Sequence, residues 1–338
     1  MIAAVKSVTL DQLDRQVVHA LILDGRAPFS RIAAAVGASE QTVARRYRRM
    51  HAAGILRVVG LPNSQRLGQS DWVVRLQCVP DAAAAVADAL ARRADTSWVQ
   101  LTSGGTEIVC VVKPAEGSGR QDLLLRQLPS SRRIVAISAQ SLLHMFRGGS
   151  EHWPGATGAL TDGQAAMLSP AVAGHVSPPA AQDLAPGDRV LLAELARDGR
   201  ASFAELAQAT HGHESTVRRR VEELRAAGVL YLDVDLDEAA YGIGTRAHLW
   251  MSVAPARLAG VGEAMAQHPE IPFVAAITGT NNLMASVLFP DDYALYRYLT
   301  ERVARLDGVN AVEVAPIIRT VKRAATVLPP PGPPGRAA

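Results

Sequence analysis

Hydrophobic positions recur with helical spacing in residues 39–53, and arginines fall between them. Val43, Tyr47 and Met50 are four and three residues apart, so on a helix they form one apolar stripe that faces a core. Ser39 suits the N-cap, because its hydroxyl can accept a hydrogen bond from a free backbone N–H of the first turn. A helix with one buried stripe and an arginine face is typical of the recognition helix of a helix-turn-helix, which enters a DNA major groove. A solvated surface helix is the alternative interpretation.

The same pattern occurs a second time. Asp24-Gly25-Arg26 recurs as Asp198-Gly199-Arg200, a shift of 198 − 24 = 174, and Arg45-Arg46 recurs as Arg219-Arg220. The apolar stripe recurs at the same shift as Val217, Val221 and Leu224. Matched identities together with matched periodicity indicate that one folding unit has been duplicated, since a solenoid would repeat at a shorter period.

Both predicted recognition helices carry side chains that can contact phosphates or base edges. The candidate DNA contacts are Ser39, Gln41, Thr42, Arg45, Arg46, Arg49, Thr216, Arg219 and Arg220. The first helix opposes its arginines with Glu40 alone, whereas the second also carries Glu214, Glu222 and Glu223. Carboxylates beside phosphates are repelled, so we expect the first half to contribute more of the electrostatic affinity for DNA.

Each helix-turn-helix is followed by a different pattern. In residues 70–146 and again in 244–323, strand-like runs and helical runs alternate in the order β-α-β-β-α-β, which is the ferredoxin-like arrangement. One face of such a sheet is covered by its two helices and the other needs a partner. We therefore expect the two sheets to pair, within a chain or between chains, and chains to assemble further.

The predicted fold class is α+β, with two winged helix-turn-helix domains alternating with two ferredoxin-like domains. The predicted helix-turn-helix domains are residues 8–60 and 182–236. Residues 147–181 are rich in glycine, alanine and proline and are predicted to be a linker with a weak helical stretch near 164–168. Residues 324–338 are predicted to be a disordered tail.

Composition narrows the class of protein. The chain has 338 residues and a net charge of only +3, so its basicity is local to the recognition segments. Cys78 and Cys110 lie in apolar runs without metal-ligand spacing, which is typical of buried thiols in a reducing cytosol. We see no signal-peptide pattern and no apolar run long enough to span a membrane, so we expect a cytoplasmic protein without a membrane partner. His211 and His213 could ligate a metal, but polar turn residues are the simpler interpretation, and we predict neither metal nor cofactor.

These features resemble the Lrp/AsnC family of bacterial transcription regulators. The resemblance rests on the helix-turn-helix that opens with Asp14-Arg15 and on the Asp-Gly-Arg that closes its first helix. It also rests on Leu249-Trp250 and Tyr298-Leu299-Thr300 within the β-α-β-β-α-β frame. The resemblance implies a regulator that binds double-stranded DNA, dimerises through the ferredoxin-like domain, and binds a small effector, often an amino acid, at a subunit interface.

The resemblance also implies where an effector would bind. The family has a Gly-x-x-Asp turn near that site, which reads Gly104-Gly105-Thr106-Glu107 in the first half and Gly279-Thr280-Asn281-Asn282 in the second. Glycine allows close backbone approach, and threonine and asparagine offer uncharged donors and acceptors. The predicted rim of the effector site is Thr278, Gly279, Thr280, Asn281 and Asn282, although an ordinary hairpin turn would use the same residue types.

Two other classes of protein compete with a regulator. Siroheme decarboxylases share this two-domain frame, and Arg246 and His248 are the residues that could serve a tetrapyrrole enzyme. A single imidazole without a positioned partner is a weak catalytic signal, and such an enzyme has no need for the arginine face of the first recognition helix. An interaction scaffold would leave the duplicated helix-turn-helix unexplained. We therefore predict a protein that is not an enzyme.

Overall fold

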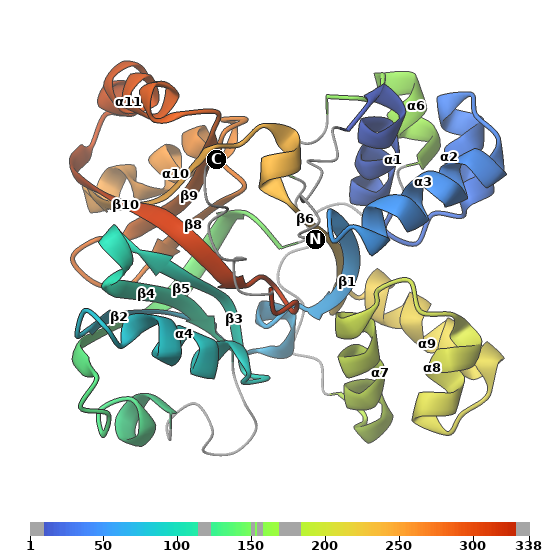
Figure 1. Cartoon of the computed structure of the whole chain (residues 1–338), viewed down its shortest axis with the longest axis horizontal. Helices are drawn as coiled ribbons and strands as arrows, with labels where there is room; N and C mark the ends of the chain where they lie inside the picture. The colour runs from blue at the N-terminus through green and yellow to red at the C-terminus, as the bar shows by residue number, and fades with distance from the viewer. Residues whose placement is uncertain (1–9, 114–122, 150–152, 154–157, 169–183, 329–338) are drawn as a thin grey trace, which may run out of the picture. The chain divides into compact units, whose positions relative to one another are not determined.

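The structure is a computed structural model that describes residues 10–113, 123–149, 153, 158–168 and 184–328 (Figure 1). The chain divides into two compact units. Residues 1–69 and 142–314 belong to one unit, and residues 70–141 and 315–338 belong to the other. Most of the predicted tail, from residue 329, and the predicted linker from 169 to 181 lie outside the described residues.

The first helix-turn-helix is built from three helices and a strand. These are α1 (Gln12–Leu23), α2 (Phe29–Val36), α3 (Glu40–Ala52) and β1 (Leu56–Pro62). Val43 and Met50 of the predicted stripe are completely buried and Tyr47 is almost so, which confirms the orientation of α3. They pack on Val17 and Leu21 of α1 in one core.

The second helix-turn-helix repeats this plan. Its elements are α7 (Pro186–Arg197), α8 (Phe203–Thr210), α9 (Glu214–Ala226) and β6 (Leu230–Leu236). Val217, Val221 and Leu224 are buried against α7 and α8, as their spacing predicted. The predicted duplication is therefore also a duplication of structure.

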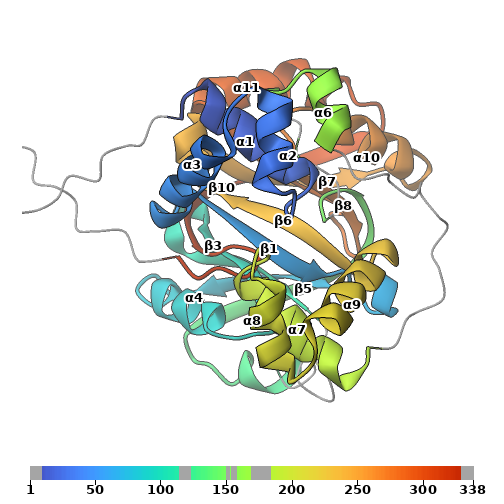
Figure 2. The ribbon, with the colours of Figure 1, turned by 90° about the vertical axis from the view of Figure 1, so that its right-hand side faces the viewer.

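Strands β1 and β6 pair with each other and join the two helix-turn-helix domains, as Figure 2 shows. The pairing is antiparallel and runs from Leu56 opposite Leu236 to Pro62 opposite Leu230. Val59 stands opposite Asp233, and these two residues are equivalent in the duplication, because 59 + 174 = 233. Equivalent residues meet only at a symmetry axis, so an approximate two-fold axis relates the two domains.

The described residues of the first ferredoxin-like domain form strands β2 to β5, with a helix and a π-helix between them. These are β2 (Trp72–Cys78), α4 (Ala83–Ala91), β3 (Thr96–Thr102), β4 (Glu107–Val112), the π-helix η3 (Leu123–Gln127) and β5 (Ile134–Arg147). The strand order is β5-β2-β4-β3. Beyond β3 the sheet gains one more strand, because the end of β10 (Val309–Lys322) pairs with it, with Ile317 opposite Thr102.

The second ferredoxin-like domain has the same layout. Its elements are β7 (Thr245–Val253), α10 (Leu258–Ala266), β8 (Phe273–Ile277), β9 (Leu283–Phe289), α11 (Asp292–Glu301) and β10. Strands β8, β9 and β7 are neighbours in that order. The end of β5 pairs with β8, with Leu142 opposite Ile277. The edge strands β3 and β8 are thus both covered, which removes exposed edges that favour aggregation.

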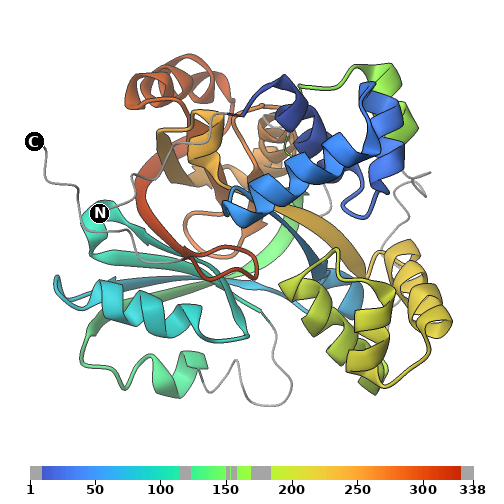
Figure 3. The same cartoon turned by 45° about the vertical axis from the view of Figure 1, so that its right-hand side comes forward.

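The weak helical stretch predicted between the two halves is α6 (Asp162–Leu168), and it packs on the first helix-turn-helix (Figure 3). Leu160 and Leu168 are buried in the core of that domain. The Leu160 N–H donates to Nδ1 of the buried His19 at 3.0 Å. This part of the predicted linker therefore serves as an additional helix of the first domain.

Short helical turns connect the main elements. They are η1 (Gln65–Leu67), η2 (Ser103–Gly105), η5 (Glu238–Tyr241), η6 (Pro255–Arg257) and η7 (Val303–Arg305). Both cysteines are buried and free, and burial raises the pKa of the Cys110 thiol to about 12. No helix in the described part of the chain has the length and apolar character needed to cross a membrane.

The turn before α9 contains a residue in the left-handed region. His211 has a φ of 53°, and its counterpart before α3 is Gly37, with a φ of 69°. An L residue there costs about 1–2 kcal/mol, and glycine loses part of that advantage through its greater freedom in the unfolded chain. We expect His211→Gly to stabilise the protein by roughly 0.5–1 kcal/mol in denaturant unfolding.

The reciprocal change is the control for this prediction. A Cβ on Gly37 would meet no atom within 4 Å, so Gly37→Ala tests backbone strain alone and should destabilise the protein. If His211→Gly gives no gain in unfolding free energy, the turn is not strained.

Candidate nucleic-acid interface

The first turn of α3 is fixed by its own cap. The Ser39 hydroxyl oxygen accepts from the Thr42 N–H at 3.2 Å, and the Ser39 hydroxyl donates to Thr42 Oγ1 at 2.9 Å. Gln41 lies between them with an exposed side chain. Ser39 and Thr42 therefore define the start of the helix, and Gln41 is the residue there whose amide is available to a ligand.

Two of the predicted DNA contacts on α3 hold the domain together. Asp14 of α1 is completely buried, and its carboxylate binds Arg49 at 2.5 Å and Arg46 at 3.3 Å. Arg46 also binds Asp11. A buried carboxylate is costly without a charged partner, so these arginines anchor α3 on α1.

The second helix-turn-helix contains the equivalent ion pair. Arg220 donates through Nε and Nη2 to both oxygens of Asp188 at 2.8 Å, and it also binds Glu223 at 3.0 Å. The hydrogen bonds from Arg220 lower the pKa of Asp188 below its usual value. The numbering matches the first pair, since 46 + 174 = 220 and 14 + 174 = 188.

The remaining arginines of α3 face solvent. Arg45 is exposed and makes no hydrogen bond or ion pair with any residue that the structure describes. Arg48 is also exposed, and its Nε donates to the Ala44 carbonyl of the same helix. Both charges are therefore available to a polyanion.

The corresponding charges of α9 are partly neutralised. Arg219, the counterpart of Arg45, lies 3.6 Å from Glu223. Arg218 binds Glu214 at 3.0 Å, and its guanidinium lies 4.3 Å from the centre of the Phe203 ring. The difference in charge predicted from the sequence is thus reinforced by the contacts.

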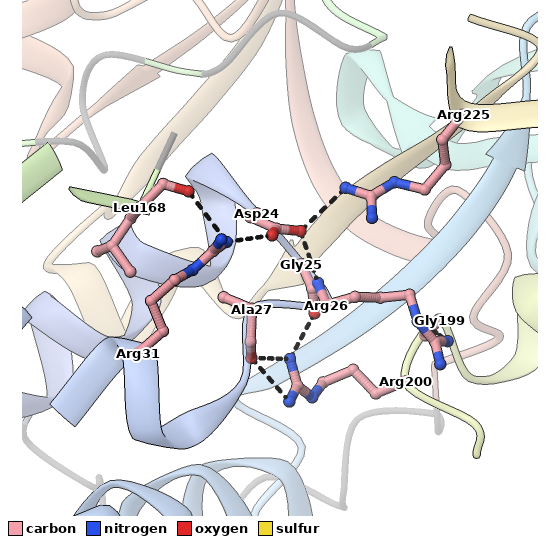
Figure 4. Close-up of polar contacts among 9 residues, drawn as sticks. All are labelled: Asp24, Gly25, Arg26, Ala27, Arg31, Leu168, Gly199, Arg200 and Arg225. Carbon is pink, nitrogen blue, oxygen red and sulfur yellow. Dashed lines mark hydrogen bonds and ion pairs between the residues drawn. The ribbon is translucent and has the colours of Figure 1, made fainter. Parts of the chain in front are cut away.

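Two arginines outside the recognition helices join the domains, as Figure 4 shows. Arg26 donates to the carbonyls of Gly199 and Ala201 at 2.8 and 2.9 Å. Arg200 donates reciprocally to the carbonyls of Gly25 and Ala27, at 2.6 and 3.1 Å. These residues belong to the repeated Asp-Gly-Arg motif, so that motif is an interface between the two copies.

Each of these two arginines also contacts an aromatic ring of the opposite domain. The Arg26 guanidinium lies 4.5 Å from the centre of the Phe203 ring, and the Arg200 guanidinium lies 4.5 Å from that of Phe29. Each ring belongs to the opposite domain and presents its negative face to the cation. Burial lowers the pKa of both arginines. The carbonyls and the aromatic rings take the place of the water that the two guanidinium groups lose.

The glycines of the motif allow the close approach of the two domains. A Cβ on Gly25 would lie 2.8 Å from Val58 and 3.0 Å from Leu232. A Cβ on Gly199 would lie 2.9 Å from the backbone of Val59. Sequence reasoning missed Gly25, Gly199 and their arginines as interface residues, although their exact recurrence was the available signal.

Of the residues predicted to form the effector rim, Asn282 connects two strands. The Asn282 amide donates to the Val253 carbonyl at 2.8 Å, and its oxygen accepts from the Val253 N–H at 2.9 Å. It therefore fastens the start of β9 to the end of β7. Thr278 and Thr280 are exposed, Asn281 is half-buried, and Gly279 has a φ of 109°.

The equivalent turn of the first half contains an internal ion pair. Glu107 is buried and binds Arg75 at 2.7 Å. Its second oxygen accepts from the hydroxyls of Thr102 and Ser103, at 2.8 and 2.9 Å. Glu107 stands where the family's turn has aspartate, and both of its carboxylate oxygens bind partners within the domain.

The two residues considered for an enzyme each have a partner in the second half of the chain. His248 is buried, with Nδ1 lying 3.1 Å from the Ser286 hydroxyl, and Arg246 lies 3.6 Å from Glu238. Within the part of the chain that the structure describes, no three histidine, cysteine or carboxylate side chains are grouped to hold a metal ion.

Comparison with known proteins places the duplicated domain in a family. The AsnC-type helix-turn-helix domain matches residues 10–51 and again 187–225, and the Lrp/AsnC ligand binding domain matches residues 246–327. The uncharacterized HTH-type transcriptional regulator PH0140 of Pyrococcus horikoshii is 31% identical over 137 residues, which are 40% of this chain and 86% of that protein. The chain belongs to the Lrp/AsnC family. PYRAB01370, a similar uncharacterized regulator of Pyrococcus abyssi, is also 31% identical over 137 residues and is covered to 86%.

Among solved structures, the fold of this Lrp/AsnC member resembles that of the siroheme decarboxylase NirDL. The two superpose with a TM-score of 0.63 over 93% of each chain, at 14% sequence identity. At this sequence identity the similarity shows a shared fold and no more. It covers nearly the whole length of both chains.

The Asp188–Arg220 pair predicts a pH dependence. Because the pKa of Asp188 is lowered by folding, its stabilisation is complete above the unfolded value of about 3.9 and is lost as the pH falls through the lower folded value. Asp188→Asn should therefore lower the unfolding free energy at pH 7 by about 1–3 kcal/mol and flatten its decline in acid.

An exposed ion pair is the matched control. Arg257 and Asp307 lie 2.8 Å apart with mostly exposed side chains, so Asp307→Asn should cost less than about 1 kcal/mol. If the two substitutions cost the same, the pairing of α7 with α9 contributes no more than a surface contact.

Proposed function

We propose that the chain is a transcription regulator that binds specific double-stranded DNA through α3 and α9 and catalyses no reaction. The observation that carries the proposal is the solvent face of α3, where Gln41, Arg45 and Arg48 are exposed opposite the buried stripe. An arginine without an internal partner supplies phosphate affinity, and a glutamine amide can read the edge of an adenine. The family membership of the chain supports the same function.

We further propose that a small, amino-acid-like effector binds at the second ferredoxin-like domain. This domain is the part that matches the Lrp/AsnC ligand binding domain. The exposed Thr278 and Thr280, together with Gly279 and Asn281, are the proposed rim, since Asn282 is occupied by Val253. We also propose that chains associate through their ferredoxin-like domains.

The alternative function is that of a tetrapyrrole enzyme, because the fold resembles that of the siroheme decarboxylase NirDL. The two functions make opposite demands on His248, because a catalytic imidazole must reach its substrate, whereas a packing residue can remain enclosed. The burial of His248 beside Ser286 supports the regulator. The preparation should accordingly show no visible tetrapyrrole absorption and no change in absorption when siroheme is added.

Selection from random DNA duplexes with the full-length protein should enrich a defined sequence. Binding should weaken with salt, with the logarithm of the affinity falling by about 0.9 per phosphate contact for each unit of log salt concentration. Failure to enrich any sequence, combined with stoichiometric pigment binding, would reject the regulator in favour of the enzyme.

Arg45 should contribute more to DNA affinity than its counterpart Arg219. Arg45→Gln should reduce DNA affinity and lower the magnitude of the salt slope by about 0.9, because one phosphate contact is lost. Arg219→Gln should have a smaller effect, since Glu223 already compensates that charge. The measurement is fluorescence anisotropy over a salt series. Equal losses from the two variants would contradict the assignment.

A further inference from the structure

The two recognition helices are presented to DNA as a pair by a single chain. Strands β1 and β6 form a continuous seven-residue ladder, and Arg26 and Arg200 each bind backbone carbonyls of the opposite domain. The centre of the ladder lies at Val59 and Asp233, so the two domains are related by an approximate two-fold axis. In a symmetric dimer such an axis requires two identical half-sites on the DNA.

The chemistry of the two helices does not follow this symmetry. At the first turn the exposed Gln41 is replaced by the exposed Ser215 (41 + 174 = 215). On the outer face the exposed Arg48 is replaced by the exposed Glu222 (48 + 174 = 222). The backbone therefore has two-fold symmetry, while the side chains that can meet DNA do not.

The contacts between the domains are also unequal at the ends of the helices. Arg225 at the end of α9 reaches across to Asp24 at 2.9 Å, where Arg31 also binds. Its counterpart in α3 is His51 (51 + 174 = 225), which stacks on the Tyr47 ring of its own helix. The charge of Arg225 is thus used to join the domains and is withdrawn from the DNA.

Each difference has a consequence for recognition. A glutamine can form a bidentate pair with the N6 and N7 atoms of adenine, whereas serine discriminates little between bases. An arginine beside a phosphate is attracted and a glutamate is repelled. The α3 half should thus be the more selective and the more tightly bound.

We infer that one chain recognises an asymmetric, two-part DNA site and binds it in a single orientation. This inference rests on the proposed function and specifies its substrate. One half-site, under α3, contains an adenine at the position that Gln41 reads and supplies most of the affinity. The other half-site, under α9, has a weak base preference and fewer phosphate contacts.

The test compares the wild-type protein with a variant whose second helix is made like the first. The variant carries Ser215→Gln and Glu222→Arg, at two positions where the residues are exposed. Random duplexes should yield a site with one strong half for the wild type and an inverted repeat of that strong half for the variant. The variant should also show a salt slope larger in magnitude by about 0.9, because one phosphate contact is gained.

A DNA-cleaving reagent attached to the protein then shows which helix lies on which half-site. It also distinguishes asymmetry within one chain from asymmetry that arises when several chains assemble on the DNA. An iron chelate is attached to Glu40→Cys or to the equivalent Glu214→Cys, both at exposed positions. The two native cysteines are buried, so the introduced thiol is the reactive one. Cleavage from position 40 should fall in the strong half and cleavage from position 214 in the weak half.

The outcomes separate this inference from the function on which it rests. A palindromic site with equal halves for the wild type, or cleavage of both halves from each position, would overturn the asymmetric site and leave a DNA-binding regulator. No enriched sequence with either protein would overturn the proposed function and the inference with it.

Discussion

The reciprocal contact of Arg26 and Arg200 with the backbone of the opposite domain is the interaction on which the arrangement of the DNA-binding part depends. Two guanidinium groups lie at one interface, where burial and mutual repulsion disfavour them. The structure compensates with carbonyl acceptors, the faces of Phe29 and Phe203, and the carboxylates of Asp24 and Asp198. Planar guanidinium is suited to this combination of forked hydrogen bonds and ring stacking, and lysine would not replace it. This contact joins the two domains that carry the recognition helices.

Much of the fold could be predicted because its signals are local. The spacing of Val43, Tyr47 and Met50 fixed the buried face of α3, and the recurrence of that spacing indicated the second copy. Strand and helix order likewise indicated both ferredoxin-like domains. The role of Gly25 could not be obtained in this way, because close approach to Val58 and Leu232 depends on two strands that are far apart in the chain.

The candidate site was harder to predict than the fold for a similar reason. Periodicity shows that Arg45, Arg46 and Arg49 point away from the stripe, but it does not show which of them meets a carboxylate on another helix. Asp14 and Asp188 settle this, since each is buried and takes an arginine from the recognition helix as its partner. Counting charges along α3 and α9 therefore overstates the positive field, and the exposed Arg45 and Arg48 carry what remains.

The ladder between β1 and β6 lies within one polypeptide, which changes how its formation depends on concentration. Pairing of two separate helix-turn-helix subunits weakens as a protein becomes scarce, because association is bimolecular. Pairing of two domains on one chain is governed by an effective concentration that the connecting residues set, in the millimolar range for short flexible connections. Pairing of β1 with β6 within one chain should therefore not weaken as the protein becomes scarce.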